Sequence, residues 1–241
     1  MSGILLIARR EFSAYVNTAW GWVILALALL LSGLFFNGDA MGKSAKLSAD
    51  DLERFFYDTG GFVLIMSVLL TMRLFAEERQ TGTIVLLESS PLDELQMVAG
   101  KYLSAMAVIF FFCLCSLYMP ALIFVNGKIG YDQIAVGYLG LLLMGSASVA
   151  IGTWASSISR NQILAAAIAA VVVALFLLSW VVAYVTDPPF KALVSYLAFY
   201  QKQFQPFMDG RIDTQSVVYF ASVTFAFLLL ATRSLAARRW E

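Results

Sequence analysis

Long apolar runs alternate with short polar connections along this chain, and the runs decide the fold class. Helices of this length and composition can cross a hydrocarbon core of about 30 Å. The sequence therefore predicts an all-α polytopic membrane protein with six transmembrane helices, folded as a single transmembrane domain over residues 1–241. The six apolar runs are Ala19–Phe36, Gly60–Ala76, Tyr102–Val125, Tyr131–Ser156, Ile163–Tyr184 and Ser216–Thr232.

The leader before the first run, residues 1–18, has the pattern of an amphipathic helix. Its polar positions include Arg9 and Arg10. Such a helix can lie in the membrane interface, with its apolar stripe in the inner leaflet and its arginines at the head groups. The apolar stripe is formed by Leu5, Ala8, Phe12, Tyr15 and Val16.

Two outer connections are also expected to contain helices. In "SADDLERFFYD", Ser48 is placed to cap a short surface helix before the second run. The segment 187–215 begins with two prolines, resumes helical periodicity from Phe190 to Leu197, and is interrupted at Gly210. Two alternatives fit this second segment: a re-entrant pair of short helices that dips into the outer leaflet, or a solvated loop helix.

The most polar connection is an elbow over residues 73–101, between the second and third runs. Gly82 is expected to stop one helix, and Thr83 to cap a short second one. Ser90 as N-cap, Pro91 at N1 and Asp93 at N3 are expected to start a third helix. The apolar tip (Ile84, Val85 and Leu87) is flanked by Glu77, Glu78, Arg79 and Glu88.

An exposed apolar tip indicates a partner protein that docks against it. The alternative is a small cap on the inner face, packed against the leader helix.

The composition limits which classes of function the chain can have. Hydrophobic residues make up 61% of the chain and charged residues 13%. The 16 basic and 16 acidic residues cancel, which gives no indication of a nucleic-acid partner, and histidine is absent. Cys113 and Cys115 lie inside an apolar run and are interpreted as packing residues. No catalytic residue, metal site or phosphate-binding loop is found, and no acid lies in the runs beyond Asp132 in the first turn of the fourth, so an intramembrane enzyme or an ion-driven transporter is poorly supported.

Basic residues near the ends of the runs predict the orientation. Arg9, Arg10, Arg73, Arg160 and Arg233 fall on one side, which by the positive-inside rule is the cytoplasm. Both termini and the elbow are then cytoplasmic.

Small residues in the fourth run allow close helix contact. The alternatives are packing within the chain or a face for another membrane subunit. The residues are Ser148, Gly152 and Ser156.

"EERQTGTIVLLESSPLDELQMVAGK" resembles the segment between the second and third spans of type-2 ABC exporter membrane subunits. The resemblance implies that this segment is a coupling helix docking on a dimeric ABC ATPase, which would bind ATP and Mg²⁺ in place of this chain. It also implies a second permease subunit, as a homodimer or heterodimer. The docking residues implied are Glu77, Glu78, Thr81, Gly82, Thr83, Ile84, Val85, Leu87, Glu88 and Pro91.

The C-terminal part points to a subfamily. "QKQFQPFMDGRIDTQSVVYF" and the basic tail are similar to gliding-motility-associated ABC permeases, although Gln203 stands where many of those sequences have histidine. The function expected is a non-catalytic permease subunit of a bacterial inner membrane, surrounded by lipid, that couples ATP hydrolysis to export. The alternative is a mechanotransmitting subunit that acts on a periplasmic partner and moves no substrate.

Overall fold

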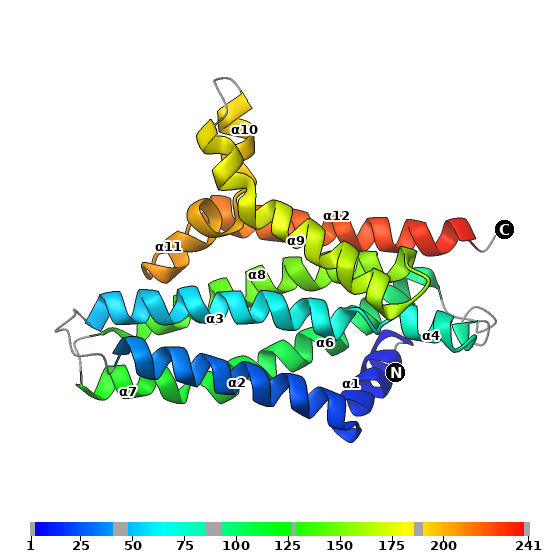
Figure 1. Ribbon diagram of the computed structural model, residues 1–241, viewed down its shortest axis with the longest axis horizontal. Coiled ribbons are helices and arrows are strands. Elements are labelled where there is room, and N and C mark those ends of the chain that lie inside the picture. Colours follow the sequence, from blue (N-terminus) through cyan, green and yellow to red (C-terminus); the bar gives the residue numbers. More distant parts are fainter. Residues whose placement is uncertain (1–2, 41–47, 85–92, 127–128, 186–189, 239–241) are drawn as a thin grey trace.

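The computed structural model describes residues 3–40, 48–84, 93–126, 129–185 and 190–238, and no strand occurs within these ranges. Most helices run along one long axis, and α9 crosses them obliquely (Figure 1). The helices are α1 (Gly3–Asn17), α2 (Ala19–Ala40), α3 (Ser48–Thr71), α4 (Ala76–Gln80), α6 (Glu94–Ser116), α7 (Tyr118–Asn126), α8 (Tyr131–Ile158), α9 (Gln162–Val185), α10 (Phe190–Tyr196), the π-helix η1 (Phe199–Phe204), α11 (Gln205–Met208) and α12 (Thr214–Arg238).

Six helical segments are long and apolar enough to cross a membrane. Each of the six predicted runs falls inside one of them, so the all-α polytopic fold is confirmed. The observed segments are longer than the predicted runs because the helices continue into the polar flanks. They are Ala19–Gly38, Ser48–Gln80, Glu94–Val125, Tyr131–Ile158, Gln162–Val185 and Thr214–Ala237.

Helix α8 is the central element, in contact with α3, α6, α9 and α12. Its small residues face α3: a Cβ added at Gly152 would collide with the side chain of Thr71. Ser148 and Ser156 are fully buried, and Ser148 donates to the carbonyl of Gly145 at 2.9 Å. This row of small residues therefore packs within the chain.

The predicted surface helix at Ser48 is not separate from the second span. Helix α3 runs without interruption from Ser48 to Thr71. The reason is that Leu52, Phe55 and Phe56 are buried, so the apolar stripe of the span continues through the segment that was predicted to form a separate surface helix.

The third span is divided at Leu117 between α6 and α7. Pro120 follows three residues later and has no N–H to donate to the carbonyl of Ser116. The hydroxyl of Ser116 lies 2.9 Å from the hydroxyl of Tyr138 on α8. The interruption is therefore explained by one proline.

The connection from α9 to α12 differs from the expected run of helix. Helix α10 ends at Tyr196, Ala198 is extended, and the π-helix η1 follows. Two carbonyls at this break are taken by side chains: Gln203 donates to Tyr196 at 2.8 Å and Tyr219 to Leu197 at 3.0 Å. Gly210 adopts a φ of 76° and turns the chain toward α12, at the position predicted for a break.

Helix α10 packs against α9, and together they project sideways from the bundle (Figure 1). The π-helix and α11 instead lie against the bundle, where Phe199, Phe204 and Phe207 are fully buried. The two ends of the bundle are called here the elbow end, which carries α4, and the opposite end, which carries α7 and the start of α3.

Candidate functional site

The elbow begins with a turn that the sequence did not predict. The second span was expected to continue as one helix to Gln80, but α3 ends at Thr71 and α4 starts at Ala76. Ser156 of α8 stabilises the restart, since its Oγ accepts hydrogen bonds from the backbone N–H groups of Phe75 and Ala76 at 3.0 and 3.1 Å. A side-chain oxygen that accepts N–H groups at a helix start acts as a cap. Here the cap comes from another helix.

An ion pair fixes the direction in which the chain leaves α3. Both Nε and Nη2 of Arg73 donate to the carboxylate of Glu77, each at 2.7 Å. Two parallel bonds of this kind hold the planes of both groups. The guanidinium also lies 6.0 Å from the centre of the Trp20 ring at the start of α2. The residues before α4 are thereby tied to the first span.

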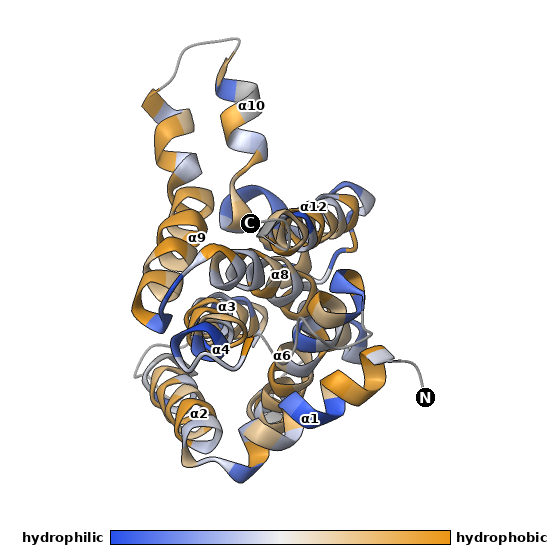
Figure 2. Ribbon diagram, turned by 90° about the vertical axis from the view of Figure 1, so that its right-hand side faces the viewer, coloured by the Kyte–Doolittle hydropathy of each residue, from blue (hydrophilic) through white to orange (hydrophobic). Residues whose placement is uncertain are grey.

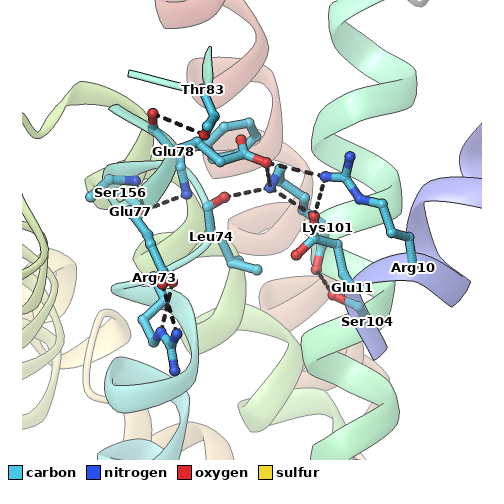
Figure 3. A network of polar contacts seen from close by, with 12 residues as sticks. Arg10, Glu11, Arg73, Leu74, Glu77, Glu78, Thr83, Lys101, Ser104 and Ser156 are labelled. Atoms are coloured by element: carbon cyan, nitrogen blue, oxygen red, sulfur yellow. Dashed lines mark hydrogen bonds and ion pairs between the residues drawn. The ribbon is translucent and has the colours of Figure 1, made fainter. Parts of the chain in front are cut away.

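Lys101 of α6 is the centre of a buried ion network (Figure 3). Its side chain is only 1% exposed, and its Nζ lies 3.0 Å from the carboxylates of both Glu11 and Glu78. The same ammonium donates to the carbonyl of Leu74 and lies 5.1 Å from the centre of the Phe75 ring. One lysine therefore joins α1, α4 and α6.

Arg10 completes the network from the exposed side. Its Nη2 contacts Glu11 at 2.6 Å and Glu78 at 3.1 Å. The two cations and two carboxylates balance, as is required where burial makes an uncompensated charge costly. Burial raises the pKa of the Glu11 carboxyl, but Lys101 and Arg10 together outweigh burial and hold that pKa below its usual value. Glu11 is therefore ionised at neutral pH.

The leader helix is present, and its packing explains how Glu11 reaches the network. Helix α1 contacts α6 along its length. Ile7 lies so close to Gly100 that a Cβ there would collide with it. The hydroxyl of Tyr15 donates to the carbonyl of Leu70 at 2.8 Å. The side of α1 that faces the protein is therefore formed by Ile7, Glu11 and Tyr15.

The predicted residues of the interfacial helix divide between two environments. Arg10 belongs to the ion network, whereas Arg9 is exposed. Leu5 and Val16 are also exposed, at 54% and 42%, and Phe12 is half-buried. Of the predicted apolar stripe, Leu5 and Val16 face away from the bundle, whereas Tyr15 is buried against the protein, so its placement in the stripe is wrong.

Toward the tip of the elbow, Gly82 has a φ of 72° and ends the α4 segment as predicted. The hydroxyl of Thr81 donates to the carbonyl of Glu77 at 2.9 Å and lies 2.9 Å from that of Thr83. Ile84 is half-buried. The other predicted docking residues lie outside the described part of the chain: Val85, Leu87, Glu88 and Pro91.

The return helix starts later than expected. Asp93 has an extended backbone, with ψ at 147°, and is the N-cap of α6. It cannot also be the third residue of a helix, so the predicted start with Asp93 at N3 is wrong. The helix therefore starts at Glu94, and the side chain of Asp93 makes no capping hydrogen bond there.

Two network residues, Glu11 and Lys101, were not selected from the sequence. In the sequence, Lys101 stands at the inner end of the third span, and Glu11 belongs to the polar side of the leader. A usable signal existed: Lys101 follows Gly100 at the start of an apolar run, where a cation needs a counter-charge. One of its two counter-charges, Glu11, comes from a helix 90 residues earlier, which no local pattern reveals.

The polar character of the elbow end is visible in Figure 2, where hydrophilic α4 lies among largely hydrophobic spans. Within the described ranges, no three His, Cys, Asp or Glu side chains gather where they could hold a metal ion. The network is thus an arrangement of hydrogen bonds and ion pairs between helices. It joins α4 to α1 and α6 through Lys101.

Six spans and a structured polar elbow define a multi-pass membrane protein. Residues 40–232 match the family model described as ABC-2 family transporter protein, and the chain belongs to this family. It is therefore a transmembrane subunit of an ABC transporter. Members of the family are in general non-catalytic and associate with an ABC ATPase. No curated protein matches the sequence.

Proposed function

We propose that this chain is the subunit that couples ATP hydrolysis in a separate ATPase dimer to movement of its membrane helices, and that the elbow over residues 73–101 is the docking segment. Substrate export by a pair of permease subunits is the output. The C-terminal similarity noted above supports a place near the gliding-motility-associated permeases.

The observation that carries this proposal is the position of Glu78. It lies on α4, next to the tip, and contacts Lys101 of α6 at 3.0 Å. If a docked partner displaced α4, the displacement would act directly on the ion pair between Glu78 and Lys101. Because Lys101 is also bound to Glu11, the same displacement would reach α1. A passive loop would have no need of a buried cation joining three helices.

Glu77 and Glu78 then have a supporting role, since both carboxylates are occupied by Arg73 and by Lys101 within the chain. Contact with the ATPase is assigned to the tip, which includes Thr83 and Ile84 and continues through Leu87. This assignment separates two kinds of substitution. Changes at the tip should prevent docking, and changes in the network should allow docking but reduce coupling.

The test is co-expression with ABC ATPase subunits of the source organism, followed by purification through this chain and measurement of ATP hydrolysis. Leu87→Asp should reduce both co-purification and stimulated hydrolysis by at least roughly tenfold, since a buried charge at an interface costs several kcal/mol. Glu78→Gln should leave co-purification intact and lower stimulation. Tyr131→Asp, at an exposed residue of the opposite end, is the matched control. If Leu87→Asp binds and stimulates like the control, the elbow is not the docking segment.

The proposal places the elbow and both termini in the cytoplasm of a bacterium with an inner membrane. Single cysteines in a chain lacking Cys113 and Cys115 test this placement. A cysteine at Thr214 should react with an impermeant thiol reagent in intact spheroplasts. A cysteine at Ser89 should react only after lysis, and labelling of Ser89 from outside would reverse the orientation.

A further inference from the structure

An apolar cavity of about 260 Å³ lies at the corner formed by α1, α2 and α6. It is separate from the ion network, which occupies the other side of α1. An apolar cavity of ~150 Å³ is large enough to bind benzene, so this one has room for a longer hydrocarbon segment. Its walls include Phe12, Val16, Trp22, Leu25, Val108 and Phe111.

The polar atoms of the cavity walls are already bonded within the protein. The indole N–H of Trp22 donates to the carbonyl of Val16 at 2.7 Å, and the hydroxyl of Tyr15 donates to Leu70. The Trp22 ring meets Phe111 edge to face, with centroids 6.5 Å apart. The lining therefore offers contact surface and no free hydrogen-bonding group, which selects an aliphatic ligand.

The surroundings of the cavity indicate where such a ligand comes from. Two of its three walls are membrane spans. Trp22 and Phe111 are 49% and 40% exposed, whereas Leu25 and Val108 are buried. The exposed wall residues belong to the outer surface of spans, which faces hydrocarbon. A lipid can thus enter from the bilayer, with its chain directed toward the buried wall.

A cation stands on the same side of α1 as the cavity. Arg9 and Val16 are seven residues apart, so on a helix they differ by only about 20° around the axis. Arg9 is exposed, and within the described part of the chain it has neither an ion pair nor a hydrogen bond. Arg10, on the other side, is engaged by Glu11 and Glu78. Arg9 is therefore available to a phosphate at the membrane interface.

We propose that the cavity between α1, α2 and α6 binds one acyl chain of an anionic phospholipid whose phosphate is held by Arg9. The bound chain fills the corner and fixes α1 against the first and third spans. Since α1 also carries Glu11, the lipid sets the position of one carboxylate of the Lys101 network. Binding of the lipid does not depend on the proposed coupling to an ATPase, because the cavity and Arg9 belong to this chain alone.

Photolabelling tests the acyl-chain site. The purified full chain, in detergent and depleted of native lipid, is mixed with phosphatidylglycerol that carries a diazirine at the end of one acyl chain, and is then irradiated. Labelled peptides should contain Leu25 and Val108. Val108→Phe fills the cavity and should lower this labelling several-fold, whereas Val108→Ala should retain it. Leu114→Phe, at a 48% exposed position of the same helix, is the matched control.

The alanine and phenylalanine variants at Val108 distinguish a loss of lipid binding from a loss of folding. Both alter the buried wall of the cavity, but only Val108→Phe removes space from it. The proposal is overturned if Val108→Phe labels like Leu114→Phe. It is also overturned if the label spreads equally over all exposed faces of the spans, which is the result expected of bulk lipid.

Competition tests the head group. Unlabelled phosphatidylglycerol should displace the probe about fivefold better than phosphatidylcholine with the same chains, as expected for one arginine at an interface. Arg9→Gln should abolish this preference, and Lys202→Gln, at an exposed position far along the chain, should preserve it. Equal competition by both lipids with the unchanged protein would exclude an anionic head group at Arg9.

Discussion

The elbow end and the opposite end of the bundle are held together by different interactions. At the elbow end, Lys101 is surrounded by Glu11, Glu78 and a backbone carbonyl. At the opposite end, rings pack against one another: Phe56 meets Tyr138 with centroids 5.5 Å apart, and Tyr200 meets Phe204 at 5.5 Å. Charge pairs join helices at one end, and aromatic packing joins them at the other.

Under the proposed coupling, this difference assigns the movement to the elbow end. Ion pairs between helices can exchange partners while each group keeps an opposite charge, so the arrangement of α1, α4 and α6 can change between discrete states. Close-packed rings have no comparable alternative arrangement, since any displacement opens a void. The elbow end is thus suited to receive a displacement, and the opposite end to act as a fixed point.

The largest effect is expected when the network loses its centre. Lys101→Met leaves Glu11 and Glu78 with only the exposed Arg10 as a counter-charge, and removal of one partner of a buried pair costs about 3–5 kcal/mol. The thermal unfolding midpoint in detergent should fall clearly. Lys191→Met removes an exposed lysine of α10 and should change little. Equal midpoints for the two variants would mean that the network does not stabilise the elbow end.

A smaller effect is expected at the opposite end. Gly137→Ala would push a methyl group into the Phe56 ring, and overpacking of a filled core costs about 1–3 kcal/mol. Gly38→Ala is the control, because no atom lies within 4 Å of the Cβ position there. The measurement is the thermal unfolding midpoint of each variant in detergent, which should be lower for Gly137→Ala. If Gly137→Ala is as stable as Gly38→Ala, the opposite end is not closely packed.

The cap from α8 should contribute less. Ser156→Ala removes the acceptor for the N–H groups of Phe75 and Ala76 and should cost about 1–2 kcal/mol. Ser157→Ala is a matched control from the next position, because Ser157 donates only within its own helix, to Trp154. Hydrogen exchange at Phe75 and Ala76 should quicken in Ser156→Ala alone. Unchanged exchange there would show that the turn is held without Ser156.

Acid should produce the smallest effect, through Glu11 at the elbow end. The Glu11 pKa is lowered in the folded protein, so its stabilising contribution is complete above the ordinary carboxyl pKa and is lost as pH falls through the lowered value. Between about pH 7 and about pH 3.5, the midpoint of Glu11→Gln should fall less than that of the unchanged chain, by about 2–4 °C. If the unfolding midpoints of the two chains fall equally, Glu11 does not contribute to the pH dependence of stability.

The sequence determined the membrane fold and the place of the elbow, because both follow from local composition. Every predicted apolar run lies inside an observed span, since only a helix satisfies its backbone within hydrocarbon. Gly82 ended its segment as expected because a positive φ is readily available to glycine. Such features depend on neighbours a few residues away.

Tertiary structure alone decided which polar residues are buried and where helices are interrupted. The turn after Thr71 depends on Ser156, 80 residues after Ala76, and one of the two counter-charges of Lys101 comes from α1. At the break after Tyr196, side chains of η1 and α12 donate hydrogen bonds to the backbone carbonyls of Tyr196 and Leu197. Helix starts, interruptions and buried charges are settled by whichever distant group supplies the missing hydrogen bond or charge, because burial removes the water that would otherwise supply it.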